Sequence, residues 1–391
     1  ANPTCSPSRA ALLTGQSPHS SGMFGLAHRG FGLNDYSQHI LHTLRKAGFF
    51  TALSGTQHVA LDGDKTLLGY DAILDEGRDR VDAVADFLTQ RDANRPFFLS
   101  IGFQETHRVY PEPGPDDDPR YVQPPPPFPD TPETRYDMAS FRTLARRLDE
   151  KMGRVFELID EHGLTDNTLV ICTTDHGIAF PRMKCNLYDT GIGVMLMIRW
   201  PNGDAHGFRA GRVVDSLVSH IDVFPTLCDV LGIDLPEWLE GKSLMPVLRD
   251  EKPEVNDEIF AEVTFHAAYE PQRCVRTNRW KYIRRYTESD KPVLPNCDDS
   301  PSKTLWMEHG WQNRPVAREQ LYDLVFDPHE ANNLAADPGY ATVLDEMRGR
   351  LDRWMERTND PLRKGWVDPP KGVRLNDPTG VSPSEPPFVV E

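Results

Sequence analysis

Residues 168–177 read TLVICTTDHG, and this stretch decides the class of fold. Its first half, apolar and β-branched, is typical of a buried strand. Two polar residues, Asp175 and His176, follow at the carboxyl end of that strand. Open α/β sheets bind their ligands at this end of their strands. We therefore expect Asp175 and His176 to serve a functional site rather than the packing of the core.

Helices and apolar strands alternate around this stretch, which is typical of a parallel sheet with helical crossovers. Past residue 250 the pattern changes to short strands and a final helix. The predicted fold class is therefore α/β with a mostly parallel sheet, followed by a smaller α+β part. We predict helices over residues 35–47, 81–90, 138–163 and 219–232, and strands over 49–55, 97–103, 168–173, 194–198, 280–286 and 319–324.

The length of 391 residues indicates two packed units, because single hydrophobic cores stop growing near ~250 residues. We expect a larger domain over residues 1–250 and a C-terminal domain over residues 251–391. The second domain should end in a helix whose apolar face includes Met347 and Leu351. From Asp360 onward, frequent prolines predict a tail that wraps the surface.

Charge and composition argue against some classes of partner. The 59 acidic residues outnumber the 43 basic ones and give a net charge of -16, which repels a nucleic-acid backbone. A small anionic substrate is still compatible, because a few focused cations in a site outweigh the global field. No apolar stretch reaches the ~20 residues that span a bilayer. The sequence thus predicts no nucleic-acid partner and no membrane span, and it leaves the cellular compartment open.

The segment CSPSR, residues 5–9, combines a cysteine with signals for the start of a helix. Ser6 or Ser8 suits a helix cap, and Pro7 suits the first turn. We expect Cys5 at or just before the N-terminus of this helix. Backbone N–H groups and the helix dipole favour anions there, and they lower the pKa of a thiol.

CSPSR followed by LTG at residues 13–15 resembles the signature of the sulfatase family. In that family a separate formylglycine-generating enzyme oxidises the cysteine of Cys-x-Pro-x-Arg to formylglycine. The resemblance implies that Cys5 becomes an aldehyde whose hydrate is the nucleophile: one hydroxyl attacks sulfur, and the other later expels sulfate. It also implies that Arg9 holds the formylglycine, and that the fold is an alkaline-phosphatase-like three-layer α/β sandwich.

Further residues occur in the order that the family shows. Asp175 and His176 match the second half of its metal site, which binds a divalent cation, usually Ca²⁺, with Mg²⁺ as the alternative. Lys184 matches a basic residue that contacts the sulfate. His58 and His107 match histidines near the sulfate and the formylglycine hydroxyls, and one of them is a candidate general acid for the leaving group. Each residue also has a plain structural alternative, such as a turn cap or a solvated surface side chain.

The resemblance continues to the far end of the chain. Residues 275–286 and 319–338 look like the C-terminal domain of the sulfamidase branch, which removes N-linked sulfate from glucosamine. His266 precedes them and is a candidate for binding substrate. The implied substrate is a small sulfated molecule or glycan, with N-sulfate and O-sulfate both open. The family implies a periplasmic, secreted or lysosomal location, although a cytoplasmic one stays open.

Two departures from the family pattern affect the site. The family begins with a strand that ends in paired aspartates, and nothing before Cys5 provides them. We therefore expect that the sequence lacks its natural N-terminal strand and, with it, part of the metal site. In addition, many sulfatases carry a lysine where this chain has Thr56. Candidate replacement cations are His28, Arg29 and Lys65.

Three alternatives to a sulfatase remain at this point. The first is a phosphate or phosphonate ester hydrolase of the same superfamily. The second is a truncated, inactive homologue that keeps an anion-binding site, which the two departures would explain. The third is a cysteine hydrolase in which Cys5 acts directly with His58 or His107. This last alternative accounts for the helix N-terminus but leaves Asp175 and Lys184 unexplained.

Overall fold

The computed structural model of the protein describes residues 1–74, 78–201, 203, 207–208 and 210–391. Its first sheet has the strand order β2-β1-β3, and all of its strands are parallel. The register runs from Phe50 opposite Phe97 to Gly55 opposite Gly102. The expected parallel sheet is therefore present here. Its strands are β1 (Phe50–Gly55), β2 (Ala72–Ile73) and β3 (Phe97–Gly102).

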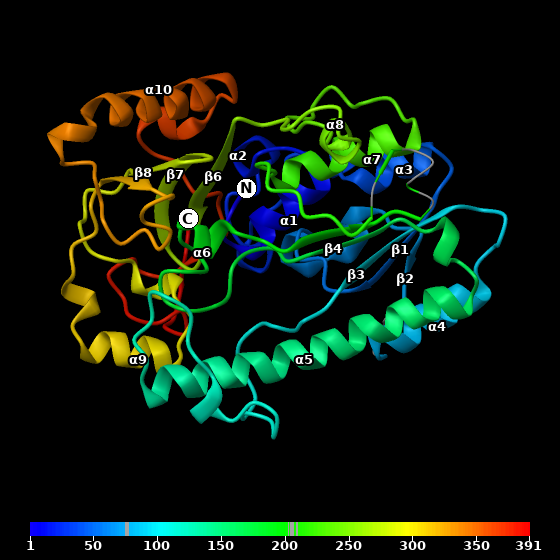
Figure 1. The fold of residues 1–391 in the computed structure, drawn as a ribbon, viewed down its shortest axis with the longest axis horizontal. Helices are drawn as coiled ribbons and strands as arrows, with labels where there is room; N and C mark the ends of the chain where they lie inside the picture. The colour runs from blue at the N-terminus through cyan, green and yellow to red at the C-terminus, as the bar shows by residue number, and fades with distance from the viewer. Residues whose placement is uncertain (75–77, 202, 204–206, 209) are drawn as a thin grey trace.

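Figure 1 shows helices on both sides of this sheet, with α3 and α7 above it and α4 and the long α5 below it. The α-helices of the described residues are α1 (Cys5–Thr14), α2 (Pro18–Ser21), α3 (Ile40–Lys46), α4 (Arg80–Gln90), α5 (Pro132–Glu161), α6 (Asp189–Ile192), α7 (Val223–Leu231), α8 (Met245–Leu248), α9 (Pro301–Glu308) and α10 (Ala341–Arg357).

Successive residues of β3 point to opposite layers of helices, because side chains alternate across a strand. Phe98 packs with α3 and with Phe224 of α7. Leu99 packs with Leu88 of α4 and Leu158 of α5. The sheet is thus buried on both faces, and the predicted α/β fold with helices on either side is confirmed.

A second, two-stranded sheet contains the strand of the TLVICTTDHG segment, residues 168–177. It pairs β4 (Val170–Thr173) antiparallel with β5 (Leu196–Arg199). Both strands lie where the sequence predicts them. Asp175 and His176 follow β4 directly, so they stand at its carboxyl end as expected.

The last third of the chain forms an antiparallel sheet with the order β6-β7-β8-β9. Trp354 of α10 stacks on Phe260 of this sheet, with ring centroids 4.8 Å apart, and Met347 and Leu351 are buried beside it. The predicted apolar face of the final helix is thus confirmed. The strands are β6 (Glu258–Phe265), β7 (Tyr269–Thr277), β8 (Trp280–Arg285) and β9 (Glu319–Asp323), and the tail adds β10 (Arg374–Leu375) and β11 (Phe388–Val389). A domain boundary near residue 250 stays a prediction.

Two helix boundaries differ from the prediction for local reasons. The predicted helix over 35–47 is split, because His39 is extended (φ -66°, ψ 136°) and its side chain accepts from the N–H of Leu41 to start α3. Helix α5 begins earlier than predicted. Thr131 and Thr134 form a reciprocal cap and Pro132 fits the first turn, so the helix starts at Pro132 rather than at residue 138. Among the described residues, no helix is both long and apolar enough to cross a membrane.

A buried charged network joins the N-terminal helices to the antiparallel sheet. Arg273 lies 2.6 Å from Asp360 and 3.1 Å from Glu262, and all three side chains are at most 1% exposed. Glu262 also lies 2.9 Å from His19 of α2. Burial lowers the pKa of His19, but Glu262 outweighs this and raises it above the ordinary value. The network holds the two parts of the chain together only while each charge keeps its partner.

Replacing Asp360 tests this network. We expect Asp360→Asn to lower the free energy of unfolding by about 3 kcal/mol, because breaking a buried ion pair leaves its partner uncompensated. Asp352→Asn is the matched control, since Asp352 pairs with Arg284 at the surface and is 58% exposed; this change should have little effect. Urea unfolding of both variants measures their free energies of unfolding. Equal losses of stability would contradict a stabilising role of the buried Arg273–Asp360 pair.

Candidate active site

The N-terminal helix α1 docks against the turn that follows β4. The hydroxyl of Ser8 donates to the carbonyl oxygen of Asp175 and lies 3.1 Å from Nδ1 of His220. Just before α1, the carbonyl of Pro3 accepts a hydrogen bond from the N–H of Cys185 at 2.9 Å. These contacts bring the start of α1 together with the segments that carry residues 175 and 184.

Cys5 is the first residue of α1, as the sequence predicts. The expectation that Ser6 or Ser8 caps the helix is wrong. Thr4 occupies the cap position, while the Ser6 hydroxyl accepts from the N–H of Ala27 at 3.0 Å. The hydroxyls of Ser6 and Ser8, which were expected to cap the helix, instead hydrogen-bond to residues distant in the chain.

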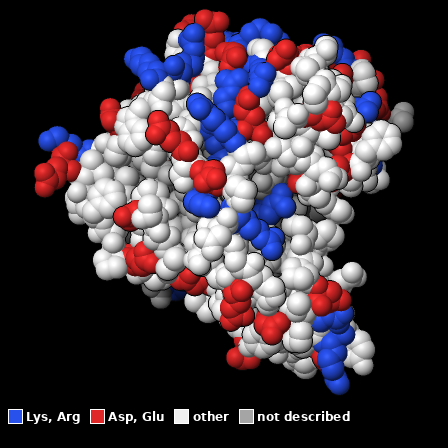
Figure 2. All heavy atoms as spheres, turned by 90° about the vertical axis from the view of Figure 1, so that its left-hand side faces the viewer, with Lys and Arg blue, Asp and Glu red and all other residues white. Residues whose placement is uncertain are grey.

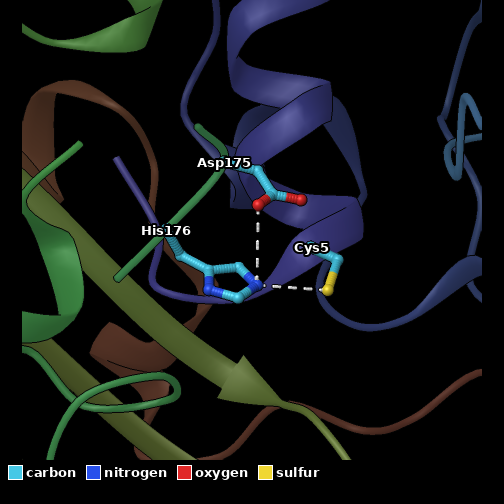
Figure 3. A group of neighbouring side chains, drawn as sticks. All are labelled: Cys5, Asp175 and His176. Carbon is cyan, nitrogen blue, oxygen red and sulfur yellow. Dashed lines mark hydrogen bonds and ion pairs between the residues drawn. The ribbon is translucent and has the colours of Figure 1, made fainter. Parts of the chain in front are cut away.

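The side chain of Cys5 points at the imidazole of His176 (Figure 3). The Cys5 sulfur lies 3.2 Å from Nε2 of His176, which is 3.7 Å from Oδ1 of Asp175. Burial lowers the pKa of His176, but the charges of Asp175 and Cys5 outweigh it and raise the pKa to about 9. His176 is thus an imidazolium at neutral pH and donates from Nδ1 to the carbonyl of Gly177 at 2.7 Å.

The same groups set the ionisation of Cys5. Burial raises its pKa, but the charges of His176 and Lys184 and hydrogen bonds from His176 and His58 bring it well below the ordinary value. The first residue of α1 therefore favours an anion. A developing negative charge on any group at this position would meet the same stabilisation.

Arg9 lies one turn further along α1 and pairs with Asp175 rather than with residue 5. Its Nε is 2.9 Å from Oδ2 of Asp175, and its Nη1 donates to the carbonyl of Thr56 at 3.3 Å. Although burial raises the pKa of Asp175, His176 and Arg9 hold it well below its usual range. A direct contact between Arg9 and a formylglycine stays a prediction.

Lys184 has a partner that the sequence analysis missed. Its Nζ lies 2.8 Å from Oδ2 of Asp298, and the Lys184 side chain is only 5% exposed. Burial lowers the pKa of Lys184, but Asp298 and Cys5 more than compensate and keep it charged. The acidic pair Asp298–Asp299 precedes α9 and looks like an ordinary helix start, so nothing in the local sequence marks Asp298 as part of the site.

His58 approaches Cys5 from the turn after β1. It adopts a left-handed backbone conformation (φ 58°), which is rare outside glycine and typical of functional positions. Its Nε2 lies 2.8 Å from Nδ1 of His28, and the two rings stack with centroids 5.1 Å apart. Of the candidate replacement cations, His28 thus contacts a predicted site residue directly.

Two further histidines lie on the side of Lys184 and Asp298. Burial raises the pKa of Asp298, but Lys184 outweighs this and lowers it well below the usual range, and His266 and His107 lie near enough to act on the same carboxylate. His266 is buried, and its Nδ1 has no hydrogen-bond partner among the described residues. Burial, first, and the charge of Lys184, second, hold the pKa of His266 well below its ordinary value, so it is neutral. His107 is exposed, and Nδ1 lies 2.5 Å from the carbonyl of Arg108.

Thr56 stands where many sulfatases have a lysine, and it contacts residues from three other segments of the chain. Arg80 donates to its hydroxyl at 3.3 Å, and its carbonyl accepts from Arg9. Arg29 follows His28 in the chain and donates to Asn376 at 2.8 Å. Lys65 begins a short 3-10 turn (Lys65–Leu68). Of these candidates, the structure shows His28 in contact with His58.

The described residues supply only part of a site for a divalent cation. Cys5, Asp175 and His176 place one ligand atom each within 4.8 Å of one another. A Ca²⁺ ion takes 6–8 oxygen ligands, whereas this group offers one carboxylate, which Arg9 already contacts. A divalent cation would displace the proton from His176 on binding, and His176 stays a predicted ligand. The residues as they stand do not complete the site.

Comparison with known proteins decides the family. The family model described as "Sulfatase" matches residues 1–233. The chain belongs to the sulfatase family. The sulfatase is therefore a hydrolase that removes sulfate groups, and its family implies a formylglycine and a divalent metal. A second model, "N-sulphoglucosamine sulphohydrolase, C-terminal", matches residues 176–313.

The sulfatase resembles relatives over nearly its whole length. It is 31% identical to human N-sulphoglucosamine sulphohydrolase, over 95% of this chain and 83% of that protein. One similar structure is a protein in complex with its substrate D-glucosamine-2-N,6-O-disulfate (TM-score 0.67, 18% identity, 92% and 89% of the two chains). Another is a phosphonate monoester hydrolase from Silicibacter pomeroyi (TM-score 0.63, 20% identity, 92% and 87%). These structures bear out the expected alkaline-phosphatase-like fold.

The ionisation of Cys5 gives a direct test of this geometry. In protein that keeps the thiol, with a chelator present, we expect iodoacetamide to modify Cys5 at pH 7 at least about tenfold faster than Cys185. The pKa of Cys5 is lowered, whereas burial raises that of Cys185, and only thiolates react. His176→Ala should move the Cys5 rate profile to higher pH. Mass spectrometry of the two peptides measures the rates, and an unmoved profile would refute the Cys5–His176 pairing.

Proposed function

We propose that this sulfatase hydrolyses the sulfate of a sulfated sugar, with the N-sulfate of glucosamine as the first substrate to test. The observation that carries the proposal is the placement of Cys5 at the N-terminus of α1, against charged His176 and within the field of Lys184. The match to the sulphohydrolase C-terminal model and the identity to the human relative support the choice of sugar.

Position 5 would supply the nucleophile after a formylglycine-generating enzyme has oxidised its thiol: the aldehyde hydrate offers one hydroxyl to attack sulfur and a second to expel sulfate. The Cys5 sulfur marks where these hydroxyls would stand. His58 hydrogen-bonds at this point and is held by His28, so we assign it to hold the proton of the attacking hydroxyl.

The remaining charges would bind the sulfate and stabilise its transition state. Lys184 is buried and held by Asp298, so its ammonium is fixed in place before substrate arrives. His176 provides a second positive charge next to position 5. His107 is exposed on the Asp298 side, and we assign it to protonate the leaving nitrogen or oxygen. A divalent metal, Ca²⁺ or Mg²⁺, held in part by Asp175 would add Lewis-acid stabilisation of the sulfate.

Sulfate release tests the nucleophile. Protein produced together with a formylglycine-generating enzyme should release inorganic sulfate from glucosamine N-sulfate, and Cys5→Ala should abolish release because no nucleophile remains. Mass spectrometry of the peptide containing residue 5 should show the aldehyde. An aryl sulfate and a matched aryl phosphonate separate the two ester chemistries. Equal turnover by Cys5→Ala would exclude the proposal, and faster phosphonate turnover would favour the second hydrolase class.

Asp298 offers a test with a close control. Asp298→Asn should lower kcat/KM by about 10- to 100-fold, because a charged hydrogen bond contributes roughly 1.5–3 kcal/mol and each 1.36 kcal/mol is tenfold. Asp299→Asn removes the same charge one residue away, where the carboxylate pairs with Lys303 and is 50% exposed. This control should stay within about twofold of the parent. Similar losses in both variants would show that Asp298 acts only through the fold.

A further inference from the structure

Two arginines lie next to each other beside the His28–His58 pair. Arg29 is the last residue of a 3-10 turn (Ala27–Arg29), directly after His28. Arg374 belongs to β10 of the C-terminal tail and donates to the carbonyl of His28. Arg29 in turn donates to the Arg374 carbonyl at 3.3 Å and to Asn376 at 2.8 Å. The tail thus places a second guanidinium at the edge of the candidate active site.

The charges of these arginines are poorly compensated. Arg29 contacts neutral oxygens, and within the described residues no carboxylate forms an ion pair with it. Arg374 has a loose pair with Asp62 at 3.7 Å, and both side chains are at least half exposed. Burial and the charge of Arg374 lower the pKa of Arg29. Like charges held together without a counter-charge are costly, and a bound anion relieves that cost.

The pair is close enough to the site to act on the same substrate. Arg29 donates at 3.4 Å to the carbonyl of Ala267, the residue after His266, and Arg374 donates to the carbonyl of His28, whose ring contacts His58. Arg29, Arg374 and His107 all contribute to the pKa of His28, which burial and neighbouring charges lower to about 4. His28 is therefore neutral near pH 7, and the two guanidinium groups carry the charge. Figure 2 shows Lys and Arg side chains gathered near the middle of one face, at a hollow, on a protein that is acidic as a whole.

We propose that Arg29 and Arg374 form a second anion subsite, which binds a carboxylate or a second sulfate of a substrate whose first sulfate reacts at position 5. This inference rests on the proposed function and narrows the substrate to sugars that carry at least two anionic groups. Planar guanidinium groups pair with two oxygens of a carboxylate or sulfate at once, so either group fits.

Binding to a variant that does not turn over substrate tests the subsite. In the Cys5→Ala background, isothermal titration would compare glucosamine N-sulfate with glucosamine-2-N,6-O-disulfate. It would also compare an N-sulfated disaccharide containing a uronate with its carboxyl-reduced form. We expect the ligand with the extra anion to bind about 10- to 100-fold tighter in at least one of the pairs. Tighter binding of the disulfate indicates that the subsite takes a sulfate, and tighter binding of the uronate disaccharide indicates that it takes a carboxylate.

Changes at the subsite should remove that gain selectively. Arg374→Gln and Arg29→Gln should each lose most of the preference for the second anion and leave the affinity for glucosamine N-sulfate within about twofold. Arg374→Lys keeps the charge and should keep much of the preference. Arg363→Gln is the matched control, because Arg363 is an exposed residue of the same C-terminal region and pairs with Glu356. It should change neither affinity.

Two results would overturn the subsite: equal affinity for both members of each pair in the parent, or the same loss for every ligand in Arg374→Gln. These outcomes are independent of catalysis. If the matured enzyme releases no sulfate but the preference and its loss in Arg374→Gln are observed, the subsite stands and the proposed reaction falls. If sulfate is released but no preference is found, the reaction stands and the subsite falls.

Discussion

The docking of α1 on the turn after β4 is the contact on which the site depends. Ser8 donates to the carbonyl of Asp175, and Arg9 donates to its carboxylate. The N–H of Cys185 donates to the carbonyl of Pro3. Residues 5 and 176 are far apart in the chain, yet their side chains meet at 3.2 Å. A helix N-terminus alone attracts anions weakly. Here it faces buried cations whose own positions are fixed, which makes the anion site specific.

The electrostatics of the site come from pairing its cations with the carboxylates of Asp175 and Asp298. Asp175 pairs with Arg9 and keeps His176 charged, and Asp298 keeps Lys184 charged. Burying these groups singly would drive them neutral. When they are paired with carboxylates, they stay charged in the folded protein. This local arrangement explains how a protein with a net charge of -16 presents a positive field to an anionic substrate.

The C-terminal part of the chain contributes residues to the candidate site and to its edge. It supplies His266 from the end of the β6–β7 hairpin, Asp298 from the segment before α9, and Arg374 from the tail strand β10. The buried network around Arg273 ties the same region to α2. Loss of that network would therefore disturb both stability and the geometry around Lys184.

Periodicity and motif order in the sequence alone determined the α/β class, most of the strands, the helix that begins at Cys5, and the grouping of Cys5, Asp175, His176 and Lys184. The first three features depend on local pattern and on strand ends, and the grouping was predicted from the order of motifs that the chain shares with the sulfatase family. Only the tertiary structure decided that Ser8 binds Asp175 instead of capping its helix, that Asp298 holds Lys184, and that Arg374 stands beside Arg29. Such pairings join segments more than a hundred residues apart. These pairings form because buried polar and charged groups need partners in the folded protein. The spacing of residues along the chain does not show which partners they find.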